Sequence, residues 1–147
     1  MSGHRASFAS TRPSLISARR LVKQWATEAG FGEGEVFDIV LATGEASTNA
    51  VLHASSEAGF WLACEVFEHR LAIQVHDFGP GFSLQGRGVY IEPHLRSAGG
   101  LGIYIMRSLM DEVSFEMDES GTTVTLVKIK RPCRSQGGAP CDQASGR

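Results

Sequence analysis

Cysteine is scarce in this chain, and the three cysteines do not form a disulfide framework. Cys64 lies in an apolar, strand-like run, so we expect it to be a small core residue. Cys133 and Cys141 lie in the segment 131–147, which is rich in Gly, Pro, Ser and Gln and nearly free of apolar residues. This composition predicts a disordered tail and disfavours a redox pair or a metal site there.

Long apolar runs and an excess of one charge are also missing. No stretch approaches the roughly 20 apolar residues of a membrane span, and the first residues lead into no apolar signal-peptide core. The net charge of −2 and the isoelectric point of about 6.2 give no basic excess of the kind that nucleic acids and anionic membranes attract. We therefore expect a cytoplasmic protein that contacts neither nucleic acid nor membrane directly.

The remaining composition is sufficient for one compact domain, which we place at residues 1–130. The chain has 147 residues, of which 42% are hydrophobic, and a domain of this size buries roughly two-thirds of its unfolded surface. We expect strands at 5–10, 60–67, 70–77, 113–117 and 122–130, and helices from Pro13 to Gly30, at 35–54 and at 100–111. This order predicts an α+β two-layer sandwich, with a mixed, mostly antiparallel sheet covered on one face by helices.

The two N-terminal helices are predicted from apolar residues at helical spacing. In the first helix, the apolar stripe consists of Leu15, Ile16, Ala18, Leu21, Val22 and Trp25. In the second helix, we expect the buried side to consist of Phe37, Val40, Leu41, Ala46, Val51 and Leu52. The two stripes predict that both helices pack on the sheet.

The second helix also carries a candidate site. Glu45 and Asn49 are four residues apart and therefore share one face. A carboxylate can orient a hydroxyl and accept its proton, and an amide oxygen is a suitable ligand for Mg²⁺. An isolated Glu/Asn pair is most simply a solvated helix face. Here the small neighbours Ala46 and Ala50 leave room for a ligand, which favours a site.

Two glycine motifs follow. Asp77 ends a strand and opens Asp77-Phe-Gly-Pro-Gly81, where Gly79 and Gly81 permit close approach to the backbone; alone, this motif is also typical of an ordinary turn. Gly100-Leu-Gly102 begins an apolar helix, whose free amides can bind an anion, although alone it is also compatible with a glycine-rich linker. The intervening segment 78–98 is long and glycine-rich, as is typical of functional loops.

Taken together, these motifs and Gly121-Thr-Thr123 resemble the Bergerat ATP-binding fold that gyrase, MutL and sensor histidine kinases share. Within that superfamily, the sequences around Glu45–Ala54 and Gly100–Val113 are similar to the anti-sigma-factor serine/threonine kinases. Arg19 and the length of the chain also fit that group. The resemblance covers residues 7–130.

The resemblance implies a role for each motif. Glu45 would be the catalytic base, and Asn49 would bind the Mg²⁺ that accompanies ATP. Asp77 would bind the adenine amine, with Gly79 and Gly81 beside the ring. The further contacts to ATP would come from Gly100, Leu101, Gly102 and Ile103 at the phosphates, Thr122 or Thr123 at the adenine, and Arg96 of a lid at the terminal phosphate. Arg96 stands further from Gly100 than the family pattern has it.

The resemblance thus implies an ATP-dependent serine/threonine kinase and anti-sigma factor. It would sequester a sigma factor and phosphorylate an anti-anti-sigma partner of the STAS type, and a homodimer is compatible with it. The alternative is a module of the same fold that regulates a partner through its nucleotide state without kinase activity. A histidine kinase domain acting in trans is disfavoured, because we see no histidine-bearing dimerisation helices before the domain.

Overall fold

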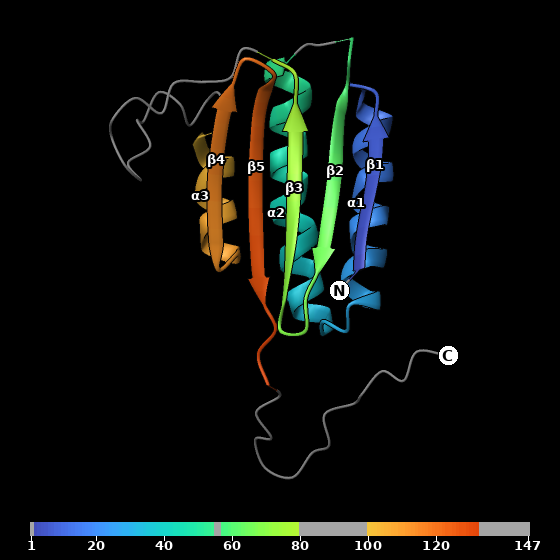
Figure 1. The fold of residues 1–147 in the computed structure, drawn as a ribbon, viewed down its shortest axis with the longest axis vertical. Helices are drawn as coiled ribbons and strands as arrows, with labels where there is room; N and C mark the ends of the chain where they lie inside the picture. Colours follow the sequence, from blue (N-terminus) through green and yellow to red (C-terminus); the bar gives the residue numbers. More distant parts are fainter. Residues whose placement is uncertain (1, 55–56, 80–99, 133–147) are drawn as a thin grey trace.

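The computed structural model describes residues 2–54, 57–79 and 100–132 (Figure 1). The strands in it are β1 (Ser2–Phe8), β2 (Phe60–Val66), β3 (Arg70–Asp77), β4 (Glu112–Asp118) and β5 (Gly121–Ile129). The helices are α1 (Arg12–Glu28), α2 (Glu33–Ala54) and α3 (Gly100–Leu109). Every expected element is present, with boundaries that differ by a few residues, and β3 has the expected bounds.

The five strands form one sheet in the order β1-β2-β3-β5-β4. Each of the four pairings is antiparallel, so the expectation of a mixed sheet was wrong for the described strands. Tight hairpins join β2 to β3 and β4 to β5, whereas the chain passes through α3 between β3 and β4 and therefore enters the sheet again at its edge. The expected α+β sandwich is confirmed: all three helices lie behind one face of the sheet (Figure 1).

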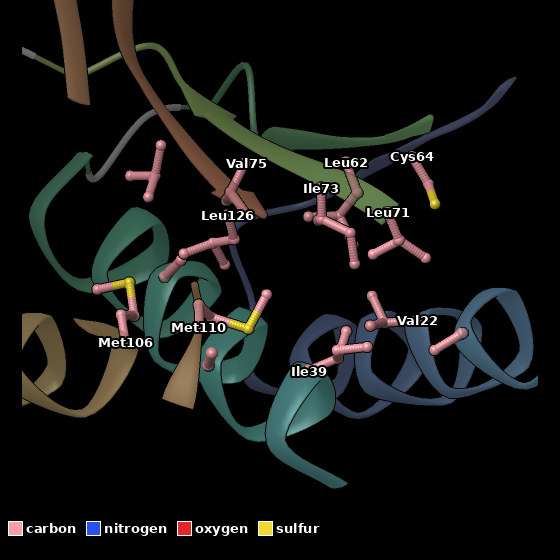
Figure 2. Packing of buried hydrophobic residues seen from close by; sticks show 14 of the residues in the cluster. Val22, Ile39, Leu62, Cys64, Leu71, Ile73, Val75, Met106, Met110 and Leu126 are labelled. Carbon is pink, nitrogen blue, oxygen red and sulfur yellow. The ribbon is translucent and has the colours of Figure 1, made fainter. Parts of the chain in front are cut away.

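The core lies between the sheet and the helices. Alternate residues of β2, β3 and β5 point toward Val22 of α1, Ile39 of α2 and Met106 of α3 (Figure 2). Cys64 is among these core residues, as expected, and is fully buried with a free thiol. Burial raises the pKa of the Cys64 thiol to about 12, which keeps it protonated and unreactive at neutral pH.

The buried side of α2 differs in part from the expectation. Phe37 and Leu52 are 66% and 63% exposed, and Leu41 is also exposed. Ala46 is buried as expected, and Val40 and Val51 pack against the core. The buried residues of the helix, mostly small, are Val36, Ile39, Ala42, Thr43, Ala46, Ser47 and Ala50. Because α2 packs on the sheet between α1 and α3, small residues allow close approach on that side. Ile16 of α1 is likewise exposed rather than part of the buried stripe.

Two lysines near the end of β5 connect the sheet to the ends of helices. The ammonium group of Lys128 is buried, donates to the carbonyl of Leu109 at 2.5 Å and lies 3.5 Å from Asp38 of α2. Lys130 donates to the carbonyl of Ala29 at the end of α1. Positive groups satisfy the free carbonyls at helix C-termini, so these contacts hold the helical layer in place against the sheet.

Candidate functional site

The four sequence motifs converge at one end of the sandwich. The second half of α2, the end of β3, the beginning of β5 and the beginning of α3 all lie at the upper end of the molecule in Figure 1. This convergence follows from the topology, because β3 and α2 run upward in this view, while β5 and α3 begin there. Residues separated by more than 70 positions in the sequence are thereby brought to one region.

Glu45 and Asn49 are placed by α2. Both side chains are half-buried, while Ala46 and Ala50 on the neighbouring face are almost fully buried. Within the same turns, the hydroxyl of Thr48 donates to the carbonyl of Gly44. The carboxylate and the amide therefore lie at the edge of the core, where they are fixed by the helix but remain accessible.

Helix α3 begins directly against this pair. A Cβ atom added to Gly102 would lie 3.0 Å from Oε2 of Glu45 and 3.6 Å from Nδ2 of Asn49. Glycine at this position thus lets the two helices approach closely. The first turn of α3 contains no acidic residue, and amides in the first turn of a helix have no partner within that helix. Backbone amides of a kind that can bind an anion, a carboxylate and a side-chain amide therefore meet at one place.

Asp77 and Thr122 form the sheet side of the site. They are directly paired between β3 and β5, and each lies two residues from a buried core residue of its own strand, Val75 or Val124. Residues two apart in a strand share a face, so both belong to the face that the helices cover. The carboxylate of Asp77 accepts a hydrogen bond of 2.9 Å from the N–H of Gly79, which shapes the turn after the strand. Thr122 is 1% exposed, and its hydroxyl has no hydrogen-bond partner among the described residues.

The backbone conformation at Gly121 explains why the last motif begins with glycine. Its φ is +133°, and a Cβ atom there would collide with the carbonyl of Asp77. A residue with a side chain at this position would push the two strands apart. Gly121 therefore allows Asp77 and Thr122 to lie side by side.

The two threonines of the Gly121-Thr-Thr123 motif face opposite sides of the sheet. Thr122 lies on the face covered by helices, whereas Thr123 lies on the outer face, where its hydroxyl shares a hydrogen bond of 2.7 Å with Nδ1 of His76. Sequence alone left Thr122 and Thr123 as equal candidates. Only Thr122 lies beside Asp77 on the face of the site.

Some predicted site residues lie outside the described residues. Gly81, Arg96 and the part of the expected lid from residue 80 to 98 belong to that group. Arg19 is described, and its guanidinium lies over α2, because a Cβ atom at Gly44 would be 2.9 Å from its Nε. Arg19 thus stands beside the residue that precedes Glu45. His76 received no role from the sequence, although its place one residue before Asp77 on a strand already put it on the opposite face.

A cavity of about 510 Å³ lies elsewhere, at the other end of α2. It is lined by Gly34, Glu35, Phe37, Asp38, Lys128, Ile129 and Arg131. Its two cationic side chains are already paired, Lys128 with Asp38 and Arg131 with Asp111. Glu45, Asn49 and Asp77 do not line it. We therefore assign the site from the chemistry of its groups rather than from cavity size.

The groups at the upper end fit a nucleotide with its metal ion. The buried hydroxyl of Thr122, which has no partner in the part of the chain that the structure describes, lies beside Asp77 and suits the polar edge of a base. The amides at the start of α3 suit phosphate, and the side-chain oxygen of Asn49 is a ligand type that Mg²⁺ accepts. Groups that can hydrogen-bond to a base thus lie on the sheet side of the site, and amides that can donate to phosphates lie at the start of α3.

Comparison with known proteins agrees with this arrangement. Residues 8–128 match the model of the histidine kinase-like ATPase domain. The chain is 39% identical over 130 residues to the serine-protein kinase RsbW of Bacillus licheniformis, covering 80% of each chain. It is also 39% identical over 128 residues to RsbW of Bacillus subtilis, covering 80% of this chain and 79% of that protein.

Solved structures share the fold. The RsbU and RsbW domains of a Mycobacterium tuberculosis protein superpose with a TM-score of 0.68 at 21% identity, over 91% of this chain and 34% of that one. In the SiaB–SiaC complex of Pseudomonas aeruginosa, the TM-score is 0.61 at 14% identity, over 86% of this chain and 88% of that one. At such identities the likeness concerns the fold alone.

The chain therefore belongs to the histidine kinase-like ATPase family. Its relatives within that family are the RsbW serine-protein kinases, which confirms the kinase family predicted from the sequence. The described residues contain no helix long and apolar enough to cross a membrane.

Proposed function

We propose that this protein transfers the terminal phosphoryl group of ATP to a serine or threonine of a STAS-type anti-anti-sigma protein, and that it sequesters a sigma factor when that partner does not compete. The names of its relatives, serine-protein kinase RsbW, support the kinase part. One structural neighbour was solved as a two-protein complex, which supports a partner-binding role for this fold.

In this proposal, Glu45 accepts the proton of the attacking hydroxyl. Its carboxylate is held by α2 at the edge of the core, next to the beginning of α3. Asn49, one turn further along α2, would hold Mg²⁺ through its amide oxygen. Bound Mg–ATP would supply the phosphoryl group and neutralise charge on the phosphates. The residues of the protein then have mainly to position the hydroxyl and the phosphates.

The nucleotide would be held at its two ends. Asp77 would accept from the exocyclic amine of adenine, with Thr122 beside it and Gly79 and Gly81 near the ring. The amides of Gly100, Leu101, Gly102 and Ile103 would donate to the phosphates. Arg96 stays a candidate for the terminal phosphate. The position of the Thr123 hydroxyl on the outer face of the sheet favours Thr122 as the threonine that contacts adenine.

The observation that carries this proposal is the packing of Gly102 on Glu45 and Asn49. It joins three groups that phosphoryl transfer needs: a proton acceptor, a metal ligand and an anion-binding helix start. A module that only bound nucleotide would need the last two but would have no use for a carboxylate aimed at the phosphate end.

The test is incubation of the purified chain with labelled ATP, Mg²⁺ and candidate STAS proteins from the same genome. We expect label on one serine or threonine of one of them, and none when Mg²⁺ is removed with a chelator. Nucleotide binding without transfer to any STAS protein, together with binding to a sigma factor, would favour the module without kinase activity. Absence of ATP binding would contradict the proposal altogether.

A further inference from the structure

The outer face of the sheet carries a compact cluster directly behind the candidate adenine site. It consists of His76, Trp61, Phe78 and Thr123, which we call the His76 cluster. His76 is only 6% exposed, although none of the described helices covers this face (Figure 1). Such burial is uncommon for a polar ring on a sheet face that no described helix covers.

Two of the contacts of the His76 ring are with residues that directly follow members of the candidate adenine site in the sequence. The ring stacks on Trp61 of β2 at 4.9 Å between centroids, and Phe78 meets it edge-on at 4.8 Å. Nδ1 of His76 and Oγ1 of Thr123 share a hydrogen bond of 2.7 Å. Phe78 is the residue that follows Asp77, and Thr123 is the residue that follows Thr122.

The register of β3 and β5 links these contacts to the opposite face of the sheet, where Asp77 and Thr122 lie. His76 pairs with Thr123, and Asp77 pairs with Thr122, in consecutive rows of the β3–β5 ladder. Successive side chains of a strand point to opposite faces. The His76–Thr123 hydrogen bond therefore joins, from behind, the same two strand ends that present Asp77 and Thr122 in front.

We propose that His76 is a positioning residue for adenine recognition, which acts through Thr123 and Phe78 to fix the spacing between Asp77 and Thr122. A base-reading pair must be held to about 0.5 Å to discriminate between purines. Gly121 lets the two strands come together at the last row of their ladder but offers no side chain to pack there. The His76 cluster supplies the packing and the hydrogen bond that glycine does not.

This inference rests on the proposed nucleotide site, and the experiment separates the two. The measured quantity is adenine preference, defined as the dissociation constant of inosine triphosphate divided by that of ATP. Inosine triphosphate carries an oxygen in place of the exocyclic amine, so it cannot donate to Asp77. A general loss of folding weakens the binding of both nucleotides, whereas a misplaced Asp77–Thr122 pair lowers the adenine preference itself.

The variants are matched in size and position. Thr123→Val removes the hydroxyl that binds His76 and keeps the shape of the side chain. Thr125→Val makes the same change two residues further along the same strand and on the same outer face, and it serves as the control. His76→Ala removes the ring, and His76→Asn restores a polar atom near the position of Nδ1.

We expect Thr123→Val and His76→Ala to lower the adenine preference by about 3- to 10-fold, which corresponds to one neutral hydrogen bond, and Thr125→Val to leave it unchanged. The double variant that combines His76→Ala with Thr123→Val should lose no more adenine preference than His76→Ala alone. His76→Asn should recover part of the preference while the aromatic contacts stay lost.

Three results are decisive. Equal weakening of both nucleotides in His76→Ala and Thr123→Val would overturn the inference, because it would show general destabilisation. Unchanged preference in both variants, while Asp77→Asn abolishes it, would overturn the inference and leave the proposed site standing. Unchanged preference in Asp77→Asn would overturn the adenine assignment itself, and the inference with it.

Discussion

Gly102 of α3 lies so close to Glu45 of α2 that a single Cβ atom would stand 3.0 Å from the carboxylate oxygen. The distance is shorter than comfortable van der Waals contact, and the group that would have to move is the flexible end of Glu45. The glycine therefore sets the position of the proposed base, and substitution there should change chemistry more than folding.

We expect Gly102→Ala to lower the rate of phosphate transfer by at least about 10-fold, because small misplacements of reacting groups cost this much or more. Its Tm should change little, since the helix gains a better helix former. The control is Gly34→Ala in α2, where a Cβ atom meets nothing within 4 Å. Normal transfer by Gly102→Ala would show that the position of the Glu45 carboxylate is not critical.

Removal of the proposed base should separate binding from catalysis. Glu45→Ala should bind ATP and the partner protein normally but transfer phosphate about 10²–10⁴-fold more slowly, the usual range for a general base. Calorimetry gives the affinity, and single-turnover transfer with labelled ATP gives the rate. Glu65→Ala, which removes an exposed carboxylate of β2, is the control for the change in net charge. Full activity of Glu45→Ala would place the base elsewhere.

Asp77→Asn should weaken the binding of ATP and of ADP to the same extent, because both carry adenine. The loss of a hydrogen bond to a charged group corresponds to about 1.5–3 kcal/mol, which calorimetry would detect in either nucleotide. Glu65→Gln again removes one charge far from the site and should change neither affinity. An Asp77→Asn variant that binds ATP as tightly as the wild type would contradict the adenine assignment.

The β4–β5 turn should make stability depend on pH. The carboxylate of Asp118 accepts hydrogen bonds from the hydroxyl and the N–H of Ser120, which lower the pKa of Asp118 below its ordinary 3.8. Because the folded state has the lower pKa, this stabilisation is present above about pH 4 and disappears as the pH falls through the folded pKa.

The Tm difference between wild type and Asp118→Ala should therefore be largest near neutral pH and shrink in acid. Ser120→Ala removes the hydroxyl donor that contributes most to the lowered pKa, so it should weaken this pH dependence. Thermal unfolding followed by circular dichroism from pH 7 to pH 3 measures both variants. A difference that grows in acid would have the wrong sign for a lowered pKa.

Truncation after Pro132 should leave Tm and ATP affinity nearly unchanged, because the deleted segment has no apolar periodicity with which to dock. Truncation after Lys130 should lower the Tm slightly more, since it also removes Arg131, which pairs with Asp111 at 2.7 Å. Exposed ion pairs contribute about 0.2–1 kcal/mol. A large loss of stability on truncation after Pro132 would show that residues 133–147 pack on the domain.

Local patterns were sufficient to predict every described helix and strand, because most elements carry their own periodicity or a glycine or proline at a boundary. Strand β3 and the start of α3 were predicted at the residues where they occur. The order of the motifs along the chain also predicted the ATPase family, since residue type and spacing are properties of the sequence.

Burial of α2 was decided only in the tertiary structure. This helix is apolar on more than one side, so its periodicity does not tell which stripe meets the sheet. The packing of α2 between α1 and α3 required small residues such as Ala42 and Ser47 on the inside and left Phe37 outside. Close approach of backbones, rather than the size of the apolar side chains, determined the orientation.

The same distinction holds for the site. Alternation along β5 shows from sequence that Thr122 and Thr123 face opposite sides, but not which side carries the ligand. That depends on the register with β3 and on the face that the helices cover. The sequence by itself determined the chemical groups and their order, whereas pairing between distant strands decided which of them meet, because such contacts depend on register and layer and not on local spacing.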